Sequence, residues 1–275
     1  PRAGAGAGGG DAGCGMDGGG GGATGSRERF SLQRVMVVFQ FSVSLVVLVG
    51  AFLFVRSFRS LIALNPGMRE HVITLAILSF ADSQVPPERY EEFKRELLDE
   101  VRSVPGVLNA ATTTTAPLLG ESWTHNIHVG SSEGPSKFTW VSPGYLATMG
   151  IPLKGGRGFN AADTATSPRV AIVNEAFIRK FTGGANPIGQ TLRTSSEPHY
   201  PSAVYEIVGV IPDTKYDDIR GETPAMAFAP ASQFPAQGHW TMMMIYSNAS
   251  PEAAVARKIA EAHPEIVMQF SDFQQ

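Results

Sequence analysis

Several groups of residues could in principle bind a ligand or catalyse a reaction. The first is the glycine-rich segment 184–191, which could bind phosphate. It comes within one residue of a phosphate-binding P-loop, with Gln190 at the position of the lysine that reaches the phosphates. Pro187 removes a backbone N–H from the phosphate cradle, and the segment follows a predicted helix where a P-loop follows a strand. We therefore predict an ordinary turn here.

Histidines and aspartates offer possible metal ligands. His125 and His128 are three residues apart in a segment that alternates like a strand. Side chains at i and i+3 of a strand point to opposite faces, so this pair is not expected to grip one metal. Asp213, Asp217 and Asp218 cluster in a loop that we interpret as a solvated turn.

The remaining candidates also favour structural roles. The single cysteine, Cys14, lies in a glycine-rich stretch far from any histidine, and no serine has the context of a catalytic nucleophile. Three consecutive methionines, residues 242–244, alternate faces on a predicted strand, so one or two of them fill core. Ser250 is the expected N-cap of a helix over residues 251–262. We predict no catalytic, cofactor-binding or metal-binding residue, and no enzymatic activity.

An uncharged run of 21 residues, 35–55, is the most informative feature of the chain. As a helix it spans roughly 30 Å, the thickness of the hydrocarbon core of a membrane. Arg34 precedes Val35 and Arg56 follows Val55, which defines the ends of the predicted span. The alternatives are a core helix of a soluble protein and a signal peptide. The run is too apolar all round for the first and too long for the second.

Charge and composition limit the kinds of partner that the chain is expected to bind. The net charge of −3 and the pI near 6.1 give no electrostatic footprint for nucleic acid. Residues 1–28 are rich in glycine and predict a disordered tail or linker before a span with flanks over 29–60. Three arginines before the span and two after it favour a cytoplasmic N-terminus, which places the C-terminal part outside the cytoplasm.

After the span, the pattern predicts an α+β fold. Strands over 72–80 and 107–115 flank a helix of about 87–103, and strands over 240–246 and 265–270 flank the second helix. Two such βαβ units predict a ferredoxin-like (split βαβ) subdomain of residues 71–117 plus 238–270. The intervening residues 118–237 predict an inserted β-rich subdomain. Its expected elements are strands at 126–129, 138–141, 170–173, 206–211 and 226–229 and a short helix at 174–181.

A series of motifs then appears in a specific order. It runs from Arg56-Ser57-Phe58 and Asn65-Pro66-Gly67 through the segments 141–145, 149–153 and 155–159 to VAIVNEA at 170–176 and NPIG at 186–189. The chain resembles the MacB-like periplasmic core domain of the MacB/FtsX superfamily of ABC transporter permeases. Within it, the chain is similar to the larger permeases in which this unit is duplicated and no ATPase is fused.

The resemblance implies a function and partners. It implies a bacterial inner-membrane export permease with a porter-like periplasmic part, a separate ABC ATPase subunit, and a second permease half or homodimer partner. Membrane lipid is a further partner. The start at Pro1 and the end at Gln275 suggest a fragment. From the residues alone, a single-span extracytoplasmic sensor or ligand-binding module stays open as an alternative.

Overall fold

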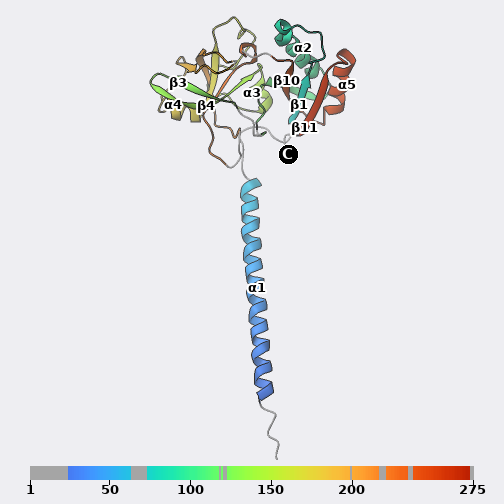
Figure 1. Cartoon of the computed structure of the whole chain (residues 1–275), viewed down its shortest axis with the longest axis vertical. Helices are drawn as coiled ribbons and strands as arrows, with labels where there is room; N and C mark the ends of the chain where they lie inside the picture. The colour runs from blue at the N-terminus through green and yellow to red at the C-terminus, as the bar shows by residue number, and fades with distance from the viewer. Residues whose placement is uncertain are drawn as a thin grey trace, which may run out of the picture. The chain divides into compact units, whose positions relative to one another are not determined.

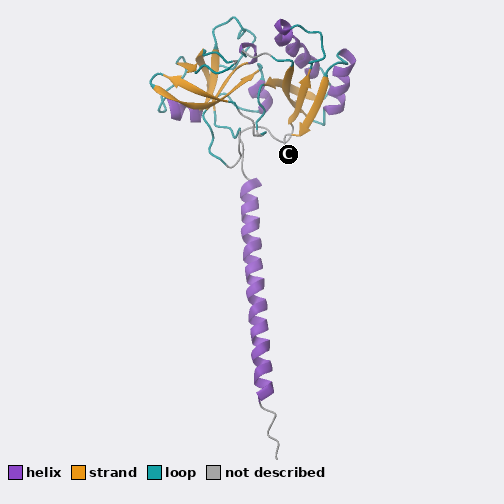
Figure 2. Cartoon of the chain, viewed as in Figure 1, coloured by secondary structure: helices purple, strands orange, loops and turns teal. Residues whose placement is uncertain are grey.

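The computed structural model describes residues 24–62, 73–117, 119, 123–198, 200–216, 221–234 and 238–272 (Figure 1). The chain divides into two compact units, residues 1–64 and 65–275. The first unit contains the single long helix α1, and the second contains strands and shorter helices (Figure 2). The mixed helix-and-strand class expected from the sequence is confirmed.

Helix α1 (Thr24–Ile62) is 39 residues long and contains the predicted apolar run. It begins at Thr24, so residues 24–28 of the predicted glycine-rich tail are helical instead. After Gly25 the sequence has no further glycine or proline until Gly50, and nothing there interrupts the helix. Residues 1–23 lie outside the described part of the chain.

The second unit begins and ends with what we call the α/β half. Four of its strands run in the order β11-β1-β10-β2, and neighbouring strands are antiparallel. Its elements are β1 (Ile73–Ser79), η1 (Pro87–Arg89), α2 (Tyr90–Arg102), β2 (Val107–Thr113), β10 (Trp240–Ser247), α5 (Glu252–Ala262) and β11 (Val267–Asp272). Every strand and helix predicted for this half is present.

The helices of this half cover one face of its strands. Phe93, Leu97, Leu98 and Val101 form the predicted apolar stripe of α2, and all four are buried. Together with residues of α5 and of the strands they form one apolar core. The methionines of β10 alternate as predicted, with Met243 in this core and its neighbour in the core on the other face of the sheet.

The middle of the chain closes into a six-stranded barrel. Strand pairing runs β4-β3-β7-β8-β6-β9, and a parallel pairing of β9 with β4 completes the ring. The six strands are β3 (Thr124–Val129), β4 (Ser132–Val141), β6 (Val170–Asn174), β7 (Thr191–Thr194), β8 (Val204–Ile211) and β9 (Met226–Pro230). The sequence predicted five of these strands and missed β7.

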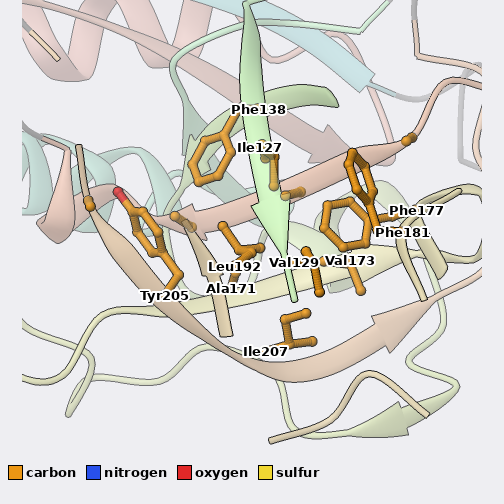
Figure 3. Close-up of a cluster of buried hydrophobic side chains, with 14 of the residues drawn as sticks. Ile127, Val129, Phe138, Ala171, Val173, Phe177, Phe181, Leu192, Tyr205 and Ile207 are labelled. Carbon is orange, nitrogen blue, oxygen red and sulfur yellow. The ribbon is translucent and has the colours of Figure 1, made fainter. Parts of the chain in front are cut away.

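Alternating side chains of every strand fill the barrel. Ile127, Leu192, Tyr205 and Ile207 point into it, and Phe177 comes from helix α4 (Glu175–Phe181) (Figure 3). The interior is therefore a packed core. The opposite faces of β4, β6, β8 and β9 are available to pack outside the barrel.

Short elements complete the fold: α3 (Tyr145–Met149), β5 (Gly155–Gly156) and η2 (Ala231–Gln233). At Gly156 the backbone has φ +74°, and a Cβ there would lie 2.1 Å from the carbonyl oxygen of Val208. Only glycine therefore allows β5 to pair with β8 at this point.

Two boundaries differ from the predictions. Strand β4 begins at Ser132, six residues before the predicted start, although it contains Pro135. At Pro135 strand β4 pairs with β3 only, because β9 joins β4 from Lys137 onward. The backbone N–H that proline lacks would therefore have had no partner strand to bond. The prediction that Ser250 is the N-cap of α5 was wrong. Pro251 occupies the N-cap position, and no side chain caps the helix.

Candidate functional site

The two histidines that first suggested a metal site both lie on barrel strand β3. His125 is buried inside the barrel, 1% exposed, while His128 lies on the opposite face of β3 beside Glu133. The prediction that these histidines face apart is confirmed. In the described residues, no group of three or more His, Cys, Asp or Glu side chains is placed to hold a metal ion.

The glycine-rich segment 184–190 forms a turn between α4 and β7, as predicted. Gly184 and Gly189 have positive φ angles, and the side chain of Gln190 donates to the carbonyl oxygen of Asn186 at 2.7 Å. The segment therefore satisfies this hydrogen bond within itself. Its glycines adopt the positive φ angles that the turn requires.

The interpretation of Asp213 as part of a solvated turn was wrong. Its carboxylate accepts the backbone N–H of Ala176 at 2.7 Å and pairs with Arg179 at 2.6 Å. The Asp213 carboxylate thus accepts one of the N–H groups that have no partner within the first turn of α4. The two residues are 37 positions apart in the chain. Asp217 and Asp218 lie outside the described residues.

The strongest candidate for a functional element is the junction between the α/β half and the barrel. Strands β2 and β4 meet there at a single residue pair, Thr113 with Val141. Backbone bonds extend the contact, from Thr114 N to Trp140 O and from Ser142 N to Thr112 O, both at 3.0 Å. The backbone connection of the two sheets is therefore short.

Side-chain hydroxyls reinforce this short connection. Thr139, on the outer face of the barrel and fully buried, lies within 3.0–3.3 Å of the hydroxyls of Thr113, Thr114 and Thr115. Tyr216 donates its hydroxyl to the carbonyl oxygen of Thr115. Burial raises the pKa of Tyr216, so this donor keeps its proton.

A single apolar core extends across the junction. It contains side chains from β1, β2 and β10 of the α/β half and the outward-facing side chains of barrel strands β4, β6, β8 and β9. Helix α3 contributes Tyr145 and Met149, both buried, and Tyr145 packs near Phe228 with ring centroids 6.2 Å apart. Figure 1 shows α3 between the two groups of strands. Moving the halves apart would expose this shared core, at about 1.5–3 kcal/mol for each large side chain.

Arg102 ties the end of α2 to the same region. Its guanidinium donates to the carbonyl oxygen of Ala110 at 2.8 and 3.0 Å and to that of Pro143 at 3.3 Å. One side chain therefore links a helix of the α/β half, strand β2 and the segment that follows barrel strand β4.

Sequence reasoning did not single out this junction. Four consecutive threonines, residues 112–115, were visible in the chain, but a threonine run is also typical of an ordinary strand. Their partners Thr139 and Tyr216 are 24 and 101 residues away from Thr115, and nothing local connects them.

The predicted span lies within α1. Residues from Arg34 to Arg59 form a stretch of 26 residues that contains an 18-residue segment with a mean hydropathy of 2.5, long and apolar enough to cross a membrane. The side chains of Val35 and Val55 are 64% and 46% exposed. The ends at Arg34 and Arg56 stay predictions.

The chain therefore combines a helix that is long and apolar enough to cross a membrane with an α+β domain that contains a barrel. The sequence matches the family described as MacB-like periplasmic core domain over residues 38–262, and the chain belongs to that family. The resemblance noted in its motifs is thereby confirmed.

A solved structure supports the fold. The periplasmic region of MacB from Actinobacillus actinomycetemcomitans aligns with a TM-score of 0.51 at 13% identity, over 78% of this chain and 94% of that chain. The extracellular domain of the ABC-type transporter YknZ from Gram-positive bacteria aligns with a TM-score of 0.47 at 14% identity, over 71% and 99%. A permease-protein domain from Porphyromonas gingivalis gives 0.45 at 17% identity, over 77% and 93%. Comparison with curated protein sequences gave no match.

Proposed function

We propose that this chain supplies a transmembrane helix and the extracytoplasmic domain of an ABC-type export permease. In this role the domain moves as one body when a partner ATPase binds and hydrolyses ATP. The observation that carries the proposal is the family membership together with the apolar core shared by the two halves. A shared core transmits displacement, because the halves cannot separate without exposing it.

The proposal includes a division of labour within the domain. Residues 71–117 plus 238–270 form a ferredoxin-like, porter-type subdomain, and residues 118–237 form an inserted subdomain built around the barrel. The βαβ order of β1, α2 and β2 and of β10, α5 and β11 supports the first assignment. Closure of the barrel within the inserted segment supports the second.

Partners and location follow from the same role. We place α1 in the bacterial inner membrane, with the domain on the periplasmic side. A separate ABC ATPase and a second permease half or homodimer partner complete the transporter. The chain itself does no chemistry in this scheme, and nucleotide is bound by the ATPase.

Distance measurements on the assembled transporter test the proposal. The chain is purified with its co-expressed ATPase after Cys14→Ser, Arg95→Cys and Arg193→Cys, which place one spin label on α2 and one on β7, both exposed. We expect the distance within one domain to stay constant between nucleotide-free and ATP-bound states. The distance between equivalent labels on the two permease subunits should change. A change within the domain, or no response to ATP, would contradict the proposed role.

A second candidate function is a single-span sensor or ligand-binding module. A cavity of about 320 Å³ beside α3 favours it, because ligand pockets of roughly 300–1,000 Å³ are usual. Its lining is mainly apolar and includes Tyr145, Leu146, Ile151, Leu153 and Phe159. Under this alternative the domain acts without an ATPase, so a chain that never co-purifies with one would favour it over the permease.

A further inference from the structure

The cavity beside α3 has an apolar lining that comes from three consecutive pieces of the chain. The end of β4 contributes Val141, α3 contributes Tyr145 and Leu146, and the segment after α3 contributes Ile151 and Phe159. Among the described residues that line the cavity, none carries a charged side chain. The lining therefore offers contact area to an apolar molecule and no countercharge to an ion.

Polar atoms of the lining residues are already bonded within the chain. The hydroxyl oxygen of Ser142 accepts the backbone N–H of Thr112 at 2.8 Å. The carbonyl oxygen of Gly144 accepts the backbone N–H and the hydroxyl of Thr148, at 2.9 and 3.0 Å. A strongly polar molecule would lose its hydration on entering without gaining equivalent bonds, whereas an apolar molecule has no such cost.

The volume of the cavity sets the size of the molecule that fits. An engineered apolar cavity of about 150 Å³ in another protein holds one benzene molecule. The cavity beside α3, at about 320 Å³, is roughly twice as large. Its size suits an uncharged molecule of about two fused rings.

We propose that this cavity binds an uncharged, mainly apolar small molecule, and that the bound molecule stabilises the junction between the α/β half and the barrel. Val141, Tyr145 and Ile151 line the cavity and also belong to the apolar core that the two halves share. Leu146 and Phe159 pack against the same core. A molecule in the cavity extends this core, and because only the folded domain has the cavity, binding stabilises the folded state.

The inference deepens the ligand-binding role described above, since it names the class of ligand and the effect of binding. It does not depend on an ATPase. The permease role and the ligand site can therefore be tested separately.

Photolabelling of the full chain in nanodiscs of phosphatidylethanolamine and phosphatidylglycerol tests the site. The probe is 3-trifluoromethyl-3-phenyldiazirine, which is uncharged and aromatic and attaches to nearby side chains when illuminated. We expect label on peptides from residues 141–159 that saturates with probe concentration and decreases at least several-fold with excess naphthalene. Label on α1 reports probe dissolved in the lipid and should not saturate. Label confined to α1, or label at 141–159 that neither saturates nor responds to naphthalene, would overturn the proposal.

Two variants locate the bound probe. Leu153 lines the cavity and is 40% exposed, so Leu153→Asp adds a charge to the lining at a position that tolerates one. Its matched control is Ile188→Asp, at an apolar side chain that is 38% exposed and lies outside the lining. Gly158→Trp fills the cavity from a lining position where a Cβ has no heavy atom within 4 Å.

Both lining variants should lose label at 141–159 at least several-fold, while the control keeps it. Unchanged label in both lining variants would overturn the site. An equal loss in Leu153→Asp and Ile188→Asp would overturn it too.

Hydrogen exchange of the full chain in the same nanodiscs measures the effect on the junction. Naphthalene should slow amide exchange at residues 107–117 at least several-fold in the parent and have no effect in Leu153→Asp. Unchanged exchange in a parent chain that binds the probe would overturn the stabilising effect. Neither readout uses ATP, so their failure removes the ligand site alone, and failure of the ATP-dependent distance change leaves measured binding intact.

Discussion

Replacing Thr139 by valine removes one hydroxyl from the centre of the junction and little else. Valine has the shape of threonine and favours strands, so the backbone of β4 should be unaffected. The lost oxygen lies 3.0 Å from Thr115, 3.2 Å from Thr114 and 3.3 Å from Thr113, and Thr139 is fully buried. The substitution therefore tests whether the hydroxyl cluster stabilises the contact between the two halves.

The magnitude follows from the partners that remain. Thr113 still donates to the carbonyl oxygen of Thr115, and Thr114 still accepts the backbone N–H of Trp140. Thr115 keeps the hydroxyl of Tyr216 at 3.3 Å. A fully orphaned buried hydroxyl costs about 1–3 kcal/mol, so we expect a loss of about 1–2 kcal/mol here. For a domain of this size that corresponds to a decrease in Tm of about 2–8 °C.

Thermal unfolding of the full chain in detergent, followed by near-ultraviolet circular dichroism, measures this decrease. The control is Thr191→Val, the same change at an exposed position of β7, which should leave Tm within about 2 °C. A Tm for Thr139→Val equal to that of the parent would refute the reasoning. So would an equal decrease in both variants, because the effect would then not belong to the junction.

Two further predictions concern the barrel. Burial lowers the pKa of His125 despite Glu197 at 3.1 Å, so the folded state resists its protonation, and stability should fall as pH decreases below the unfolded value of about 6.5. Urea unfolding at pH 7.5 and 5.5 should show a smaller loss of stability for His125→Phe than for the parent. Gly156→Ala places a Cβ 2.1 Å from a carbonyl oxygen and should lower the urea midpoint strongly, whereas Gly158→Ala, which has open space, should not.

Local pattern was sufficient to predict most of the elements. The apolar stripe of α2 has helical spacing, and the methionines of β10 alternate as a strand requires, so both could be assigned from a few neighbouring residues. Strand β7 is only four residues long, and α3 only five, which is too short for a period to show. The start of β4 was missed because its proline argues against a strand unless the partner strand is known.

The junction could not be predicted from local pattern, because it depends on pairings distant in sequence. Closure of the barrel requires β9 to lie beside β4, about ninety residues earlier, and this pairing turns Thr139 toward the α/β half. Asp213 illustrates the same limit. Its role at the first turn of α4 follows from a contact across 37 residues, and its surroundings in sequence suggested only a loop.

The two sides of the junction argue against a hinge at this point. On one side lies the apolar core with α3, and on the other α2 faces Trp140, Phe234 and Trp240 across a narrow cleft. Burial raises the pKa of Glu91 and lowers that of Lys94 on this face of α2, the changes expected where water is partly excluded. A hinge needs one side that opens without cost. Here one side would lose apolar contacts and hydroxyl bonds, and on the other side the described residues leave only a narrow cleft. Both features support the proposal that the two halves move together.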